Sequence, residues 1–201
     1  MPRQPTSAII LAAGFSTRMG EPKFDLKLPD GKSFLEHIAQ QYFDFGCEEI
    51  IVIINSDGFK YLKENPFKNP EKLSFAVNQT PESGRFGSVQ CGVNVLKTKN
   101  PVFIHNVDNP FARAETLKKL SKSLSGFDFA KPVFNGKSGH PVHVGKKVIQ
   151  AIIDETDTAI KLRSFLKQFN QQEVEVEDPS ILININTIED YRQVFKIQNI
   201  S

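Results

Sequence analysis

The sequence predicts an α/β fold, a mostly parallel sheet with helices on both faces. Short apolar runs rich in β-branched residues alternate along the chain with amphipathic segments of helical period. The runs are continuously apolar, as in Ala8-Ile9-Ile10-Leu11 and Ile50-Ile51-Val52-Ile53-Ile54, which is typical of strands buried on both faces. Ligands bind at the carboxyl ends of such strands, so the loops that follow them are the first place to look for function.

Each predicted strand is a short apolar run bounded by turn residues. In chain order the strands are Ser7–Ala12, Glu49–Ile54, Leu73–Val77, Val102–Asn106, Phe127–Val133, Pro141–Val144, Glu173–Glu177 and Ile181–Ile185.

The first helix is expected to begin at Ser33, which forms a capping box with Glu36, and to end at Gly46. Its apolar face is Phe34, Leu35, Ile38, Tyr42 and Phe45. A second helix carries Phe86, Val89, Val93 and Leu96, and others are predicted near Ala114–Leu124, Lys146–Ile153 and Ala159–Phe169. The last helix opens at Thr187 with Asp190 as its capping partner and buries Ile188, Tyr191, Val194 and Phe195.

Composition narrows the classes of function. The 201 residues, 39% of them hydrophobic, predict a single domain over residues 1–201. The net charge of +2 is spread along the chain, which argues against nucleic acid as a partner. Cys47 and Cys91 have no metal-ligand spacing, and no apolar run approaches the ~20 residues of a membrane span. We therefore expect a cytoplasmic protein without a membrane partner.

The loop after the first strand, Leu11-Ala12-Ala13-Gly14-Phe15-Ser16-Thr17-Arg18-Met19-Gly20-Glu21-Pro22-Lys23, is the most informative segment. Its glycines allow a tight turn with inward N–H groups, and Arg18 and Lys23 bring two cations to the same place. Backbone amides, an Arg and a Lys that point to one place can bind a triphosphate. The simpler alternative is a surface turn whose two cations are solvated. Neither G-x-G-x-x-G nor G-x-x-x-x-G-K-[ST] occurs in the chain.

The pattern L-A-A-G-x-S-x-R-M-G-x-x-K resembles the signature of nucleotidyltransferases that activate metabolites with a nucleoside triphosphate, in particular the molybdenum cofactor cytidylyltransferases and guanylyltransferases. The resemblance implies a Rossmann-like nucleotidyltransferase fold. It also implies nucleotide binding by Leu11, Ala12, Ala13, Gly14, Arg18 and Lys23, with Lys23 and Arg18 acting on the phosphates during catalysis.

Two further strand ends resemble the metal-binding elements of this family. Asp108, in Asp108-Asn109-Pro110, matches a D-x-P element whose aspartate holds magnesium, although Asn109 departs from the common residue. Asn186 matches a second ligand position, which the cytidylyl branch fills with aspartate in D-x-D-T. The alternatives are a helix cap for Asp108 and a turn former for Asn186. The resemblance implies Mg²⁺ as cofactor, held more weakly by an amide than by a second carboxylate.

Two more segments resemble the substrate-binding parts of the family. Asn78, Gly84 and Ser88 match the loop N…G…S…G that cradles base and ribose, and Gly139-His140-Pro141-Val142 matches a turn on the acceptor side. The resemblance implies nucleotide contacts for Asn78, Gly84 and Ser88 and an acceptor contact for His140. The alternatives are a plain loop with Ser88 at a helix start, and a structural histidine.

Together these features predict a Mg²⁺-dependent nucleotidyltransferase. It would move a nucleoside monophosphate from a nucleoside triphosphate to a phosphorylated small-molecule acceptor, with release of pyrophosphate. We expect CTP as the nucleotide substrate, because Ala12-Ala13-Gly14 and G-H-P-V favour it, whereas the asparagines at 184 and 186 favour GTP. Molybdopterin is one predicted acceptor. A sugar phosphate or an isoprenoid precursor is the alternative, because Phe24-Asp25 departs from the sequence that commonly follows the lysine in molybdenum cofactor enzymes. A silent nucleotide-binding regulator and a nicotinamide oxidoreductase remain as alternatives.

Overall fold

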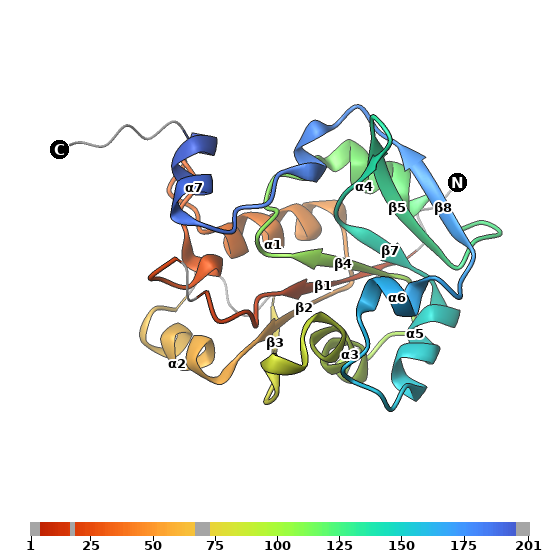
Figure 1. The fold of residues 1–201 in the computed structure, drawn as a ribbon, viewed down its shortest axis with the longest axis horizontal. Coiled ribbons are helices and arrows are strands. Elements are labelled where there is room, and N and C mark those ends of the chain that lie inside the picture. The colour runs from red at the N-terminus through yellow and green to blue at the C-terminus, as the bar shows by residue number, and fades with distance from the viewer. Residues whose placement is uncertain (1–4, 17–18, 67–72, 196–201) are drawn as a thin grey trace.

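The computed structural model describes residues 5–16, 19–66 and 73–195, and its centre is an eight-stranded sheet (Figure 1). The strands are β1 (Ser7–Leu11), β2 (Glu49–Ile54), β3 (Ser74–Val77), β4 (Val102–Asn106), β5 (Phe129–Phe134), β6 (Lys137–Ser138), β7 (Val142–Val144) and β8 (Gln171–Glu175). The order across the sheet is β3-β2-β1-β4-β7-β5-β6, and β8 pairs with β5. The fold is the predicted Rossmann-like one, with a mostly parallel, mixed sheet.

The parallel part of the sheet brings the ends of distant segments together. β1 pairs in parallel with β2 and with β4, in a register that places Leu11 beside Ile53 and Asn106. Because parallel strands end at the same edge, the loops after β1 and β4 leave the sheet side by side. β6 pairs antiparallel with β5. After a break at residues 139–141, β7 pairs antiparallel with both β5 and β4.

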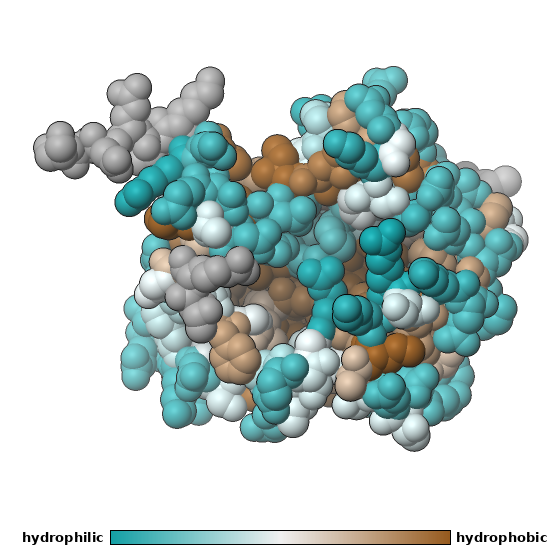
Figure 2. All heavy atoms as spheres, viewed as in Figure 1, coloured by the Kyte–Doolittle hydropathy of each residue, from teal (hydrophilic) through white to brown (hydrophobic). Residues whose placement is uncertain are grey.

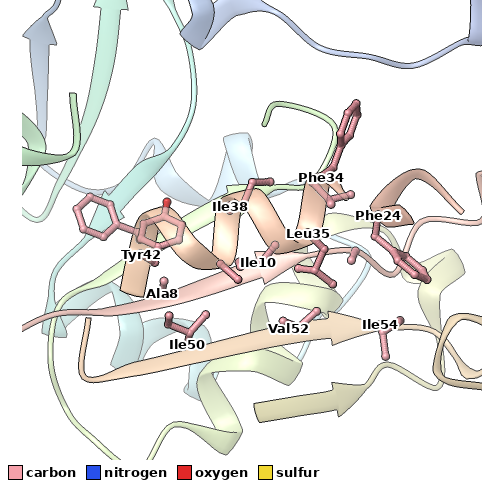
Figure 3. Packing of buried hydrophobic residues seen from close by; sticks show 14 of the residues in the cluster. Ala8, Ile10, Phe24, Phe34, Leu35, Ile38, Tyr42, Ile50, Val52 and Ile54 are labelled. Carbon is pink, nitrogen blue, oxygen red and sulfur yellow. The ribbon is translucent and has the colours of Figure 1, made fainter. Parts of the chain in front are cut away.

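Alternating residues of the parallel strands enter two cores, one on each face of the sheet. On one face Ala8, Ile10 and the even-numbered residues of β2 pack under α1 (Phe34–Phe45), as Figure 3 shows. α4 (Ala114–Ser121) covers the same face. On the other face Ile9 and Leu11 pack under α3 (Arg85–Val95), α5 (Lys146–Asp154) and α6 (Leu162–Leu166).

The caps predicted from the sequence are present at both ends of α1. Ser33 Oγ accepts the Glu36 N–H while the Glu36 carboxylate accepts the Ser33 N–H, and Gly46 closes the helix in the left-handed conformation. Thr187 and Asp190 form the corresponding pair at α7 (Ile188–Phe195).

Several predicted elements differ from the observed ones. The predicted strand at 181–185 is wrong: Pro179–Leu182 is a 3₁₀ helix, because Pro179 has no N–H for a sheet ladder and Asp178 caps the turn by accepting the Ser180 N–H. The helix predicted over Ala159–Phe169 is the shorter α6. A helix that the pattern did not predict, α2 (Ser56–Glu64), follows an Asn55 cap.

Helix α7 also buries less than predicted. Val194 is 37% exposed, while Ile188, Tyr191 and Phe195 are half-buried against the α1 face of the core. Among the described residues, every helix is too short or too polar to cross a membrane.

Candidate active site

A cavity of about 430 Å³ lies at the edge where β1 and β4 end. Figure 2 shows this side of the molecule hollowed near its centre, with hydrophilic residues around much of the rim. The cavity is lined by segments that are far apart in the chain: Leu11–Ser16, Lys23, Pro81, Gly84, Arg85, Ser88, Asn106–Asp108 and Asn186.

The loop after β1 is held together by Ser16. Ser16 has a positive φ of 51°, and its carbonyl accepts the Met19 N–H. Its Oγ accepts the N–H of Lys23 at 3.0 Å, which fixes where Lys23 starts relative to the loop. Arg18, predicted to bind the outer phosphates, lies outside the described residues, so its contribution stays a prediction.

Lys23 crosses the cavity to the last loop of the protein. Its Nζ donates to Asn186 Oδ1 at 3.0 Å, although the two residues are 163 positions apart. The Asp190 carboxylate accepts the N–H groups of Asn186 and Thr187, and these bonds lower the pKa of Asp190. The cap of α7 therefore holds Asn186 in place for the amine of Lys23.

Asp108 supplies a carboxylate to the same cavity. Burial raises its pKa, while the Arg85 and Lys23 cations oppose that change. Its Oδ1 is buried and has no hydrogen-bond partner in the described part of the chain. The next helix, α4, begins at Ala114 after the N-cap residue Arg113 and has no side-chain cap, so Asp108 does not have the helix-cap role that was the alternative.

The donor set fits a hard divalent cation. Mg²⁺ prefers oxygen ligands and usually completes its shell with water and substrate phosphates. Asp108, whose buried Oδ1 has no hydrogen-bond partner in the described structure, and Asn186, which carries an amide oxygen, both line one cavity. No group of three His, Cys, Asp or Glu side chains occurs among the described residues, so protein groups alone would not enclose a metal.

The loop before α3 contributes unequally to the cavity. Gly84, at φ 87°, begins the helix, and Ser88 lies in its first turn; both line the cavity. Asn78 does not line it: its Nδ2 donates to Ser88 Oγ and its Oδ1 accepts the Thr80 N–H. Asn78 thus holds the loop in shape, and its predicted direct contact with nucleotide remains a prediction.

His140 stands behind the cavity, not in its lining. Its Nε2 lies 3.0 Å from Asn106 Nδ2, and Asn106 does line the cavity. Burial, followed by the Arg85 charge and His105, lowers the pKa of His140 to about 3, so the ring is neutral at pH 7. Since Nε2 faces an amide donor, the proton of the neutral ring belongs on Nδ1, which is buried without a partner in the described structure.

Of the residues that the structure describes, six in the cavity lining were missing from the sequence-based prediction of the site: Phe15, Ser16, Pro81, Arg85, Asn106 and Val107. Two of them, Arg85 and Asn106, interact with predicted site residues. Arg85 directly follows Gly84, and its charge acts on both Asp108 and His140. Asn106 is the last residue of β4, so its place at the carboxyl end of a parallel strand was the signal that could have indicated it.

Comparison with known proteins identifies the family. Residues 8–174 match the model of the MobA-like NTP transferase domain. The chain belongs to this family of nucleotidyltransferases. A probable molybdenum cofactor guanylyltransferase of Carboxydothermus hydrogenoformans is 23% identical, over 96% of this chain and 97% of that protein.

Two further relatives show the range of the family. A 2-C-methyl-D-erythritol 4-phosphate cytidylyltransferase of Clostridium botulinum is 30% identical, over 63% of this chain and 57% of its own length. Among solved structures, molybdopterin-guanine dinucleotide biosynthesis protein A of Archaeoglobus fulgidus superposes with a TM-score of 0.70 at 17% identity, covering 94% of this chain and 97% of that one. This last likeness shows the fold.

Proposed function

We propose that this nucleotidyltransferase transfers a nucleoside monophosphate, GMP in first place, from a nucleoside triphosphate to a phosphorylated pterin of the molybdopterin type. The observation that carries the proposal is the shared cavity, where the glycine-bearing loop, Lys23, Asp108 and Asn186 face one another. An ammonium beside oxygen donors suits the polyphosphate of a nucleotide and the phosphate of an acceptor.

In the proposed reaction an oxygen of the acceptor phosphate attacks the α-phosphorus in line. A bond forms between that oxygen and phosphorus, while the bond from the α-phosphorus to the oxygen bridging to the β-phosphate breaks. Pyrophosphate leaves with the electron pair, and no covalent intermediate with the enzyme is required. Lys23 neutralises charge that develops at the α-phosphate, and Arg18 is assigned to the outer phosphates.

Asp108 and Asn186 are the residues that would hold a divalent cation, with Mg²⁺ as the proposed ion. Such an ion supplies charge neutralisation and fixes the orientation of phosphate oxygens. The protein contributes one carboxylate and one amide oxygen, so most of the remaining ligands are expected to come from the triphosphate and water.

The choice of base rests on names and sequence features that point in different directions. Guanylyl transfer is favoured by Asn186 and by relatives that bear the name guanylyltransferase. The similarity to these relatives extends over most of their length. Cytidylyl transfer, preferred from Ala12-Ala13-Gly14 and G-H-P-V, is the second candidate, and the Clostridium botulinum relative bears a cytidylyltransferase name. A sugar phosphate or isoprenoid precursor as acceptor belongs with this second candidate.

The test is a matrix of pyrophosphate-release assays with GTP, CTP, ATP and UTP, each with molybdopterin, a sugar phosphate and methylerythritol phosphate. We expect Mg²⁺-dependent release with GTP and molybdopterin to exceed every other pair. A larger rate with CTP would move the assignment to cytidylyl transfer and keep the reaction class.

Pyrophosphate release together with thermal-shift measurements separates the other classes of function. A nucleotide-binding regulator would be stabilised thermally by Mg²⁺ and a triphosphate but would release no pyrophosphate with any pair. A nicotinamide oxidoreductase would be stabilised by a dinucleotide instead, and the chain lacks G-x-G-x-x-G. A cytoplasmic location, expected for an enzyme that uses these metabolites, is part of the proposal.

A further inference from the structure

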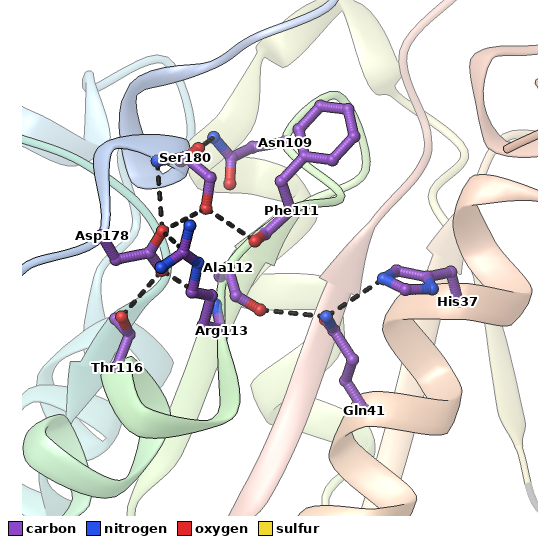
Figure 4. Close-up of polar contacts among 9 residues, drawn as sticks. All are labelled: His37, Gln41, Asn109, Phe111, Ala112, Arg113, Thr116, Asp178 and Ser180. Carbon is purple, nitrogen blue, oxygen red and sulfur yellow. Dashed lines mark hydrogen bonds and ion pairs between the residues drawn. The ribbon is translucent and has the colours of Figure 1, made fainter. Parts of the chain in front are cut away.

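Asn109, the residue that departs from the family pattern beside Asp108, is fully buried and bonded to a distant segment. Its Nδ2 lies within hydrogen-bond distance of three backbone carbonyls, at 3.2 Å from Ser180 O, 3.1 Å from Ile181 O and 2.6 Å from Ile183 O. Figure 4 shows Asn109 beside Ser180 and the side chains that surround them.

The orientation of this amide follows from its surroundings. If Asn109 were turned over, its carbonyl oxygen would face three backbone carbonyl oxygens, which only accept hydrogen bonds. The NH₂ group must therefore point at the 180–183 segment, and Oδ1 is left buried without a partner in the described structure.

The backbone of Asn109 is itself held rigidly. His105 Nε2 lies 2.7 Å from Asn109 O, and His105 Nδ1 lies 2.8 Å from the Tyr42 hydroxyl. Because a carbonyl only accepts, Nε2 carries the proton and Nδ1 accepts from Tyr42. All three side chains are fully buried, so Asn109 is anchored in the core that α1 covers.

The segment that Asn109 holds leads directly to the active site. Ile185 N donates to Asp108 O at 2.8 Å, and the next residue, Asn186, accepts from Lys23. His140 N also donates to Ile181 O at 3.1 Å, so one carbonyl is shared by Asn109 and the turn on the acceptor side.

We infer that Asn109 is a positioning residue for nucleotidyl transfer, which sets where Asn186 stands relative to Asp108 and Lys23 by holding the backbone of residues 180–183. The inference rests on the proposed function for the reaction that it affects. It assigns to the side chain a task that a buried apolar residue of similar size would not perform.

The test compares Asn109→Leu with a matched control, Thr116→Val. Thr116 is also buried and donates to Asp178, which caps the same 3₁₀ turn, but among the described residues it has no hydrogen bond to residues 183–186. We expect Asn109→Leu to lower turnover roughly ten- to a hundredfold, the scale of a misplaced active-site group, while Thr116→Val keeps the turnover of the unchanged protein. Asn109→Ser, which retains one donor, should fall between them.

A double-mutant cycle distinguishes positioning from general weakening. In an Asn186→Ala background, Asn109→Leu should reduce turnover much less than it does alone, because both changes act on the same contact. The inference would be overturned if the fold-losses in turnover of Asn109→Leu and Asn186→Ala simply multiplied in the double variant. Equal losses of turnover in Asn109→Leu and Thr116→Val would also overturn it.

A second readout does not depend on activity. Amide hydrogen exchange at Ile185, whose N–H is bonded to Asp108 O, should be faster in Asn109→Leu or Asn109→Ser than in Thr116→Val. Unchanged exchange in the Asn109 variants would overturn the inference even if the reaction differs from the proposed one. If the unchanged protein releases no pyrophosphate with any substrate pair, the proposed function fails, and exchange at Ile185 still decides the positioning.

Discussion

Lys23 Nζ and Asn186 Oδ1 are 3.0 Å apart, which joins the first loop of the fold to the last loop before α7. Ser16 orients Lys23 from one side and Asp190 orients Asn186 from the other. The amine is thus held by Asn186 at the cavity that both residues line, without any bound substrate. An interaction of this kind costs little reorganisation at the moment of reaction.

Lys23→Ala is expected to lower turnover by roughly a hundredfold or more, the usual scale for removing one transition-state donor. Folding should remain intact, because the lysine is only half-buried and its backbone bond to Ser16 is retained. Steady-state kinetics of pyrophosphate release measure the change, with Lys27→Ala, a surface lysine paired to Asp25, as the control. A raised KM with unchanged turnover would mean that Lys23 only helps binding.

Asp108→Asn should reduce turnover further than Asn186→Ala, because it removes the carboxylate that faces the cavity and keeps the shape of the side chain. Extra Mg²⁺ or Mn²⁺ should restore only part of the rate. Without ligand the melting temperature should stay level or rise slightly, since burial already raises the pKa of Asp108 and disfavours its charge. Unfolding of the variant, or undiminished pyrophosphate release, would show that the metal site lies elsewhere.

Arg85→Ala should weaken substrate binding more than it slows chemistry. The guanidinium is exposed at the rim of the cavity and lowers the pKa values of Asp108 and His140 through its charge. We expect KM for the triphosphate or the acceptor to rise about tenfold, the worth of one charge-assisted contact, while the melting temperature stays constant. Arg85→Lys should recover part of the loss. A lower turnover number with unchanged KM values would contradict this role.

The stability of the protein should decrease as the pH falls below about 6.5. Burial lowers the pKa values of His105 and His143 to about 4, whereas both return to about 6.5 in the unfolded chain. Between these values the unfolded chain binds more protons, so acidification favours unfolding by roughly 1.4 kcal/mol per pH unit for each histidine. The stabilisation is complete above pH 6.5, the pKa in the unfolded chain. It is lost as the pH falls towards about 4, the pKa in the folded protein.

Urea unfolding at pH 7.5, 6.5, 5.5 and 4.5 measures this dependence. The lowered pKa values of Asp128 and Asp190 act below about pH 4 and do not overlap this window. His143→Gln keeps hydrogen-bonding groups near Thr6 and Leu120 without titrating, so its stability should depend less steeply on pH. An equal slope in that variant would show that other groups control acid unfolding.

Much of the fold could be predicted from the sequence, because its signals are local. The continuous apolar runs determined β1, β2 and β4 to within one residue, and the Ser33–Glu36 box and Gly46 determined both ends of α1. The loop pattern from Leu11 to Lys23 indicated the family, since a phosphate-binding loop needs particular small and cationic residues in sequence order. Asp108 and Asn186 both line the cavity, as expected from their predicted places at strand ends, although the strand predicted before Asn186 does not form.

Other features were decided only by the tertiary structure. The run Ile181–Ile185 has the apolar character of a strand, yet Asn109 takes its carbonyls and Asp178 caps its start, so the chain forms a 3₁₀ turn instead. Asn78 and His140 stand behind the cavity because partners remote in the chain, Ser88 and Asn106, take their hydrogen bonds. Side-chain bonds across 10 to 72 positions have no local signature. The sequence by itself determined most strands and helices and several of the loops that line the cavity, because these signals are local. Packing between distant segments decided the remaining elements and which residues line the cavity.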